Sequence, residues 1–100
     1  MEIRLTGTLP ENLKVLMGRL GYHENRNRQG DTSFIRRLHS LGYPRFHIYP
    51  HTTRSGVSLK LHYDEKRPSY AGSHAHSGQY DGDLVLAEAE RIDTYLKSLQ

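Results

Sequence analysis

The chain has 100 residues, 35% of them hydrophobic and 25% charged, which suits a single domain over residues 1–100 with a modest core and excludes a fully disordered chain. It has no cysteine, which excludes disulfides and thiolate metal ligands, and no apolar run near the roughly 18 residues that a membrane span requires. The formal net charge is +3. The N-terminus lacks the apolar stretch of a signal peptide, so we expect a cytoplasmic protein with no membrane partner.

The first predicted elements are a strand over residues 2–6 and a helix over residues 9–20. Apolar and polar residues alternate in the strand, as is typical of a strand with one buried face. Thr8 fits the N-cap of the helix, since a glutamate follows it three residues later, as in a capping box. Gly21 is expected to close the helix in the left-handed conformation.

The next segment predicts a polar loop over residues 22–31 and a second helix. Asp31 or Thr32 would cap this helix, and Gly42 would end it. Its apolar residues recur with helical spacing. They are Phe34, Ile35, Leu38 and Leu41.

Alternating residues around 45–49 and 57–64 predict a β-hairpin, with its turn at residues 53–56. Residues that lie opposite each other share a face of the sheet, so the apolar residues of the two strands must meet. The favoured register pairs the opposite charges of Arg45 and Asp64. It sets His47 against His62 and Tyr49 against Lys60, whereas a register shifted by one pair would set Arg45 against His62.

A long polar loop over residues 64–82 precedes a last helix that runs to about Leu99. Its buried face is expected to hold Val85, Ala89, Ile92, Leu96 and Leu99. The element order β-α-α-β-β-α predicts a small two-layer α+β domain. Its three-stranded sheet, at least partly antiparallel, should carry the helices on one face and present a polar face to solvent or to a partner.

Histidine is unusually dense, with seven residues, five of them between His47 and His76. Two histidines spaced as in His74-Ala75-His76 point the same way on an extended segment and can hold one metal ion. Four imidazoles suffice for a structural zinc site, and three with a water for a metal-dependent hydrolase. A His-ligated zinc protein is therefore one hypothesis, with His47, His62, His74 and His76 as candidate ligands.

The middle of the chain is basic, since residues 19–67 hold ten basic and four acidic side chains. Arginine and lysine bind phosphate, and aromatic rings stack on unpaired bases. The hairpin and the 64–82 loop contain both basic and aromatic residues, which predicts a phosphate-bearing partner, namely RNA or single-stranded nucleic acid. The predicted phosphate contacts are Arg45, Lys60, Lys66 and Arg67, and the predicted stacking residues are Tyr49 and Tyr70.

Two further hypotheses stay open. His47 and His62, side by side in the favoured register, suit an acid/base pair that acts on a phosphodiester without a metal. The polar sheet face would instead be a protein interface if the domain is an assembly module without chemistry of its own. Of these hypotheses, nucleic-acid binding is the one that the sequence favours.

Overall fold

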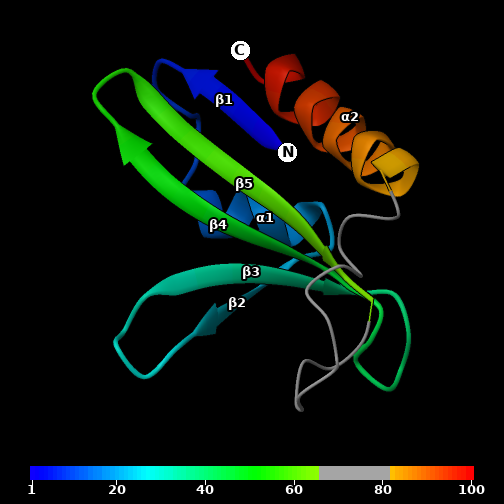
Figure 1. Cartoon of the computed structure of the whole chain (residues 1–100). Coiled ribbons are helices and arrows are strands. Elements are labelled where there is room, and N and C mark those ends of the chain that lie inside the picture. Colours follow the sequence, from blue (N-terminus) through cyan, green and yellow to red (C-terminus); the bar gives the residue numbers. More distant parts are fainter. Residues whose placement is uncertain (66–81) are drawn as a thin grey trace.

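A five-stranded antiparallel sheet forms the centre of the protein, with strand order β1-β5-β4-β3-β2 (Figure 1). The computed structural model describes residues 1–65 and 82–100. The elements are β1 Glu2–Thr6, α1 Leu13–Arg19, β2 His23–Arg26, β3 Thr32–Arg37, β4 Arg45–Thr53, β5 Gly56–Asp64 and α2 Gly82–Ser98. The predicted α+β class is confirmed. The prediction of three strands is wrong, because the segment between α1 and β4 adds two more.

These two strands, β2 and β3, form a hairpin where the sequence predicted a loop and a helix. Its turn is closed by the backbone N–H of Asn27, which donates to the carbonyl of Asp31 at 3.0 Å. Gly30 has a φ of +86°, in the left-handed region that such turns favour. A glycine-containing turn therefore joins the polar strand β2 to the largely buried strand β3, where a plain loop was expected.

Two of the apolar residues that suggested a helix, Phe34 and Ile35, lie on opposite faces of strand β3. Phe34 is 3% exposed and Ile35 is 2% exposed, yet they point to opposite faces of β3. Leu38 and Leu41, the other members of the predicted helical stripe, are 41% and 85% exposed. Burial on both faces removes the alternation that marks a half-buried strand, which is why the spacing resembled that of a helix.

Helix α1 is shorter than predicted, because it begins at Leu13 instead of residue 9. Its N-cap is Asn12, whose side-chain oxygen accepts a hydrogen bond from the Val15 N–H at 3.0 Å, so the prediction of Thr8 as the cap is wrong. The predicted C-cap is confirmed, since Gly21 has a φ of +97° just after the helix.

The β4–β5 hairpin has the register that the opposite charges favoured. Arg45 lies opposite Asp64, His47 opposite His62, and Tyr49 opposite Lys60. Thr53 pairs with Gly56, so the turn contains two residues. This hairpin therefore brings the predicted candidate residues of both strands to one face of the sheet.

Both helices pack on one face of the sheet, as predicted, and share one hydrophobic core with it (Figure 1). Four of the five residues expected on the buried face of α2 are buried, and Leu99 is partly buried. We call the opposite side of the sheet the outer face. Its residues at the centre of the sheet are Ser33, Ile35, Arg45, His47, Tyr49, Lys60, His62 and Asp64. Neither of the helices in residues 1–65 and 82–100 has the length and apolar composition needed to cross a bilayer.

A buried ionic network joins α2 to the rest of the fold. The carboxylate of Glu88, whose residue is 5% exposed, accepts two hydrogen bonds from Arg91, at 2.8 and 3.0 Å, and one from the Tyr22 hydroxyl at 2.6 Å. Arg36 on β3 lies 3.4 Å away, and Arg91 also donates to the carbonyl of Leu20 at 2.7 Å. Burial raises the pKa of Tyr22 and would raise that of Glu88, but hydrogen bonds from Arg91 and Tyr22 hold the Glu88 pKa below its usual value.

Candidate nucleic-acid interface

His47 lies at the centre of the outer face, where three strands fix its ring. Its Nε2 is 2.9 Å from the Ser33 hydroxyl oxygen on β3. Its Nδ1 is 3.1 Å from the Tyr49 hydroxyl on the same strand and 3.5 Å from Oδ2 of Asp64 on β5. Both ring nitrogens are therefore within reach of fixed partners, and the residue is only 9% exposed. The ring of His47 is therefore held in one orientation, in which it contacts Ser33, Tyr49 and Asp64.

Arg45 and Asp64 form an ion pair at the end of the hairpin, as the register predicted. The Arg45 Nε donates to Asp64 Oδ2 at 3.1 Å, and the guanidinium lies 4.5 Å from the centre of the Tyr43 ring. Burial alone would raise the pKa of Asp64, but hydrogen bonds with His47 and Arg45 outweigh it, and the pKa lies below its usual value. The charge of Arg45 is therefore largely balanced, so it is a weaker phosphate contact than the sequence suggested.

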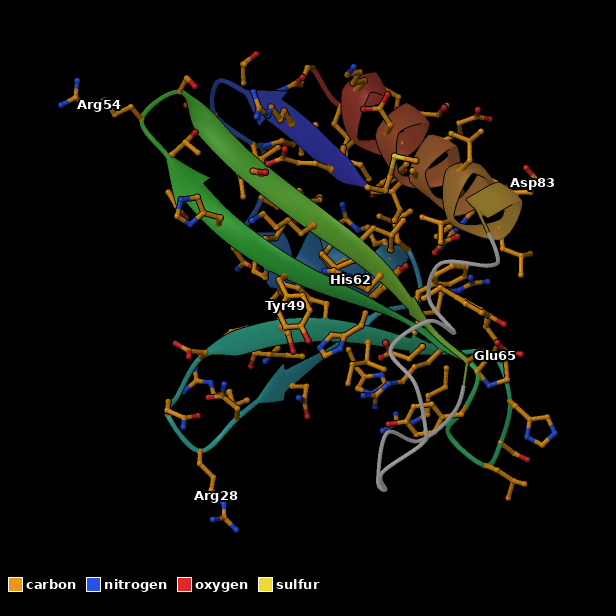
Figure 2. The ribbon with its side chains drawn as sticks, viewed as in Figure 1. Arg28, Tyr49, Arg54, His62, Glu65 and Asp83 are labelled. Carbon is orange, nitrogen blue, oxygen red and sulfur yellow. The ribbon has the colours of Figure 1, made fainter. Side chains whose placement is uncertain are left out.

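Tyr49 is an exposed aromatic residue of this surface, and 45% of its area is accessible. Figure 2 labels its ring on β4. Its ring centre lies 4.2 Å from that of His47, and the edge-on contact with His62 on β5 has a centre distance of 5.3 Å. Burial and the charge of Asp64 raise the pKa of Tyr49, which keeps the phenol neutral. The two histidines thus hold a neutral aromatic ring on the outer face, with the exposed Lys60 directly across the strand pair.

His62 is exposed on the same face and lies opposite His47, as predicted. Partial burial of its ring and the positive charge of the N-terminus lower its pKa. The lowered pKa favours the neutral imidazole. A neutral ring can stack against a base and can both donate and accept a hydrogen bond.

His23 also lies on the outer face, and it was not among the candidate residues predicted from the sequence. Nε2 of His23 on β2 lies 2.6 Å from Nη1 of Arg37 on β3. Since a guanidinium can only donate, this nitrogen accepts and the ring is neutral there. Burial and the charges of Arg37 and Arg45 lower the pKa of His23. The sequence signal was weak, because His23 stands in a segment expected to be a loop.

The four predicted zinc ligands are placed only in part. His47 and His62 lie opposite each other, whereas His74 and His76 lie outside the described residues. Within residues 1–65 and 82–100, no group of three or more histidine, cysteine, aspartate or glutamate side chains is close enough to hold a metal. Zinc binding stays a prediction that depends on residues 66–81.

The acid/base hypothesis also stays a prediction. Of its two imidazoles, His62 is the exposed one, while His47 is buried with both nitrogens near hydrogen-bond partners. A proton transfer through His47 would first have to displace one of these partners. Of the predicted nucleic-acid contacts, Arg45, Tyr49 and Lys60 share the outer face. Lys66, Arg67 and Tyr70 lie outside the described residues.

Comparisons with known proteins add no independent assignment. A scan against protein-family models, a search of curated proteins and a search of solved structures find no match to this chain.

Proposed function

We propose that this domain binds single-stranded nucleic acid, RNA first among them, on the outer face of its sheet. The observation that carries the proposal is the exposed ring of Tyr49, which contacts two imidazoles and has a lysine directly across from it. An aromatic ring on a sheet surface provides a stacking platform for an unpaired base, and nearby cations follow the phosphate backbone. The overall positive charge supports the same partner.

The residues have different roles in this proposal. Tyr49 stacks on a base, and His62 supplies a second ring and a hydrogen bond. Lys60 contacts phosphate, while Arg45 acts mainly by holding Asp64 and, through it, the position of His47. Lys66, Arg67 and Tyr70 keep the phosphate and stacking roles that the sequence predicted.

Replacement of Tyr49 with alanine should weaken binding of a mixed-sequence 12-nucleotide RNA about tenfold, because stacking contributes about 1–3 kcal/mol for each base. Fluorescence anisotropy of a labelled strand measures the affinity. Tyr49→Phe is the matched control, because it keeps the ring and removes only the hydroxyl near His47. We expect this variant to bind within about threefold of the parent protein.

The salt dependence tests the phosphate contacts separately. The logarithm of the affinity should fall linearly with the logarithm of salt concentration, and Lys60→Gln should reduce the slope by about 0.7, the share of one phosphate contact on a single strand. Lys97→Gln on α2, far from the outer face, should leave the slope unchanged. A flat salt response, or no binding at low salt, would contradict the proposal. A stable oligomer in light scattering would then favour the assembly module.

The zinc hypothesis has one supporting observation, the pairing of His47 with His62 across the hairpin. If it holds, untagged protein purified without added metal should contain one zinc ion per chain by elemental analysis. His62→Ala and His76→Ala should each remove most of this zinc, whereas His39→Ala, in the loop before β4, should leave it in place. A metal content well below one per chain would contradict the hypothesis.

A further inference from the structure

The outer face contains a hollow of about 430 Å³ between the β2–β3 turn and Tyr49. It lies at the end of the sheet that is remote from the Arg45–Asp64 pair. Tyr49 and Pro50 on β4 form one side of it, and the turn forms the other. The complete lining is Asn27, Asp31, Thr32, Ser33, Tyr49 and Pro50.

Two side chains of the turn, hydrogen-bonded to each other, give this hollow a polar wall. The backbone N–H of Asp31 donates to Oδ1 of Asn27 at 2.9 Å, and Nδ2 of Asn27 donates to Oδ2 of Asp31 at 3.4 Å. Both side chains are exposed to solvent. Among the described residues nothing bonds to Oδ1 of Asp31, and one amide hydrogen of Asn27 is also left over. The wall therefore offers carboxylate acceptors next to an amide donor.

We propose that this hollow binds a guanine base of the single strand, an inference that rests on the proposed function. The Watson–Crick edge of guanine presents two adjacent donors, the N2 amino group and N1–H, followed by the acceptor O6. A carboxylate accepts from both donors, and the amide of Asn27 donates to O6. Bases in single strands are recognised in this way, through hydrogen bonds to that edge together with stacking on aromatic rings.

The other bases do not match this wall. Adenine and cytosine each present one donor beside a ring nitrogen that has a lone pair, which a carboxylate repels. Uracil presents one N–H between two carbonyl oxygens. Because hydrogen bonds to a charged group are stronger than neutral ones, the carboxylate of Asp31 should dominate the choice of base.

The position of the hollow suits a strand that already stacks on Tyr49. The ring of Tyr49 borders the hollow, so one nucleotide can stack on the ring while its neighbour enters the hollow. Arg28, at the tip of the same turn, extends away from the sheet and into solvent (Figure 2). Its guanidinium is placed to meet a phosphate beside the bound base.

The test compares uridine nonamers that carry guanosine, adenosine, cytidine or uridine at the central position. Guanosine should bind at least tenfold tighter than the other three in fluorescence anisotropy. A strand with inosine, which lacks the N2 amino group, should bind about fivefold to tenfold more weakly than the guanosine strand. Methylation of guanine N1 should remove the gain, and 7-deazaguanine, whose Watson–Crick edge is intact, should keep it. These base analogues test the wall without any change to the protein.

Asp31→Asn replaces the acceptor pair by a mixed amide and should lower the affinity for the guanosine strand at least tenfold. Affinity for the all-uridine strand should stay within twofold. Glu90→Gln is the matched control, since it makes the same change of charge at an exposed position on α2 and should alter neither affinity.

Equal affinity for all four nonamers, with the Tyr49 dependence intact, would overturn the guanine site and leave the proposed function standing. A preference for guanosine that survives in Asp31→Asn would overturn the assigned wall. If no nonamer binds at low salt, the proposed function and this inference fail together.

Discussion

Replacing Glu88 with glutamine should lower the free energy of unfolding by about 3 kcal/mol, a large share of the 5–15 kcal/mol typical of a domain. The carboxylate is 5% exposed and balances two guanidinium groups that come from different elements, Arg36 on β3 and Arg91 on α2. Removal of one partner leaves the other charges poorly compensated. Urea denaturation followed by circular dichroism measures the change. Glu90→Gln, two residues along the same helix and exposed, should cost less than about 0.5 kcal/mol.

The pH dependence gives this prediction a second measurement. The pKa of Glu88 is lowered in the folded protein, so its contribution to stability is present above the unfolded pKa of about 4.3 and is lost as pH falls through the folded value. The protonated carboxyl group resembles the amide of glutamine. The stability difference between the parent and Glu88→Gln should therefore be full at pH 7 and shrink below about pH 4. A difference that stays constant down to pH 3 would show that shape, and not charge, accounts for the loss.

Strand β3 makes contacts on both faces of the sheet, and the Glu88 network is one of them. On the inner side of β3, Arg36 contacts Glu88 of α2. On the outer side, Ser33 holds the ring of His47, which lies against Tyr49. β3 therefore contacts the last helix with one side and the ring that lies against Tyr49 with the other. We expect Glu88→Gln to weaken RNA binding only as far as it unfolds the protein.

The sequence predicted the β4–β5 hairpin well because two independent signals agreed there. Alternating apolar residues defined the faces, and the pairing of Arg45 with Asp64 selected one register. That register then fixed His47 opposite His62. What it did not reveal is that the Tyr49 ring packs against both imidazoles, because side-chain rotamers do not follow from strand pairing.

The β2–β3 hairpin was missed because neither strand alternates. β2 is a short polar edge strand, and β3 buries adjacent residues on opposite faces. Since the turn between them was expected to be a plain loop, the hollow next to Asp31 was missed as well. Glu88 was missed for a related reason. Glutamate is usually exposed, and the partners of Glu88 on β3 and between α1 and β2 come together only in the folded chain.

The close approach of β1 to the β4–β5 turn leads to the other large effect, at Gly56. A Cβ atom added there would lie 1.8 Å from the carbonyl oxygen of Leu5, which is backbone and has little freedom to move. Gly56 pairs with Thr6, so the clash falls on the ladder that joins β1 to the sheet. Gly56→Ala should therefore push β1 away and expose Leu5, which is 3% exposed in the parent fold.

We expect Gly56→Ala to lower the free energy of unfolding by about 3 kcal/mol or more, since overpacking costs 1–3 kcal/mol and strand separation adds lost burial. Gly18→Ala is the matched control, because a Cβ there meets nothing within 4 Å and the residue lies inside α1. Alanine is a better helix former than glycine, so this variant should raise the free energy of unfolding by about 0.5–1 kcal/mol.

Amide hydrogen exchange separates the two ways in which Gly56→Ala can act. Faster exchange confined to β1 and its partner strand would show local detachment, whereas uniform faster exchange would show global loss of stability. A parent-like unfolding midpoint would mean that β1 shifts without cost, and the close approach at Leu5 would then not be a constraint on this fold.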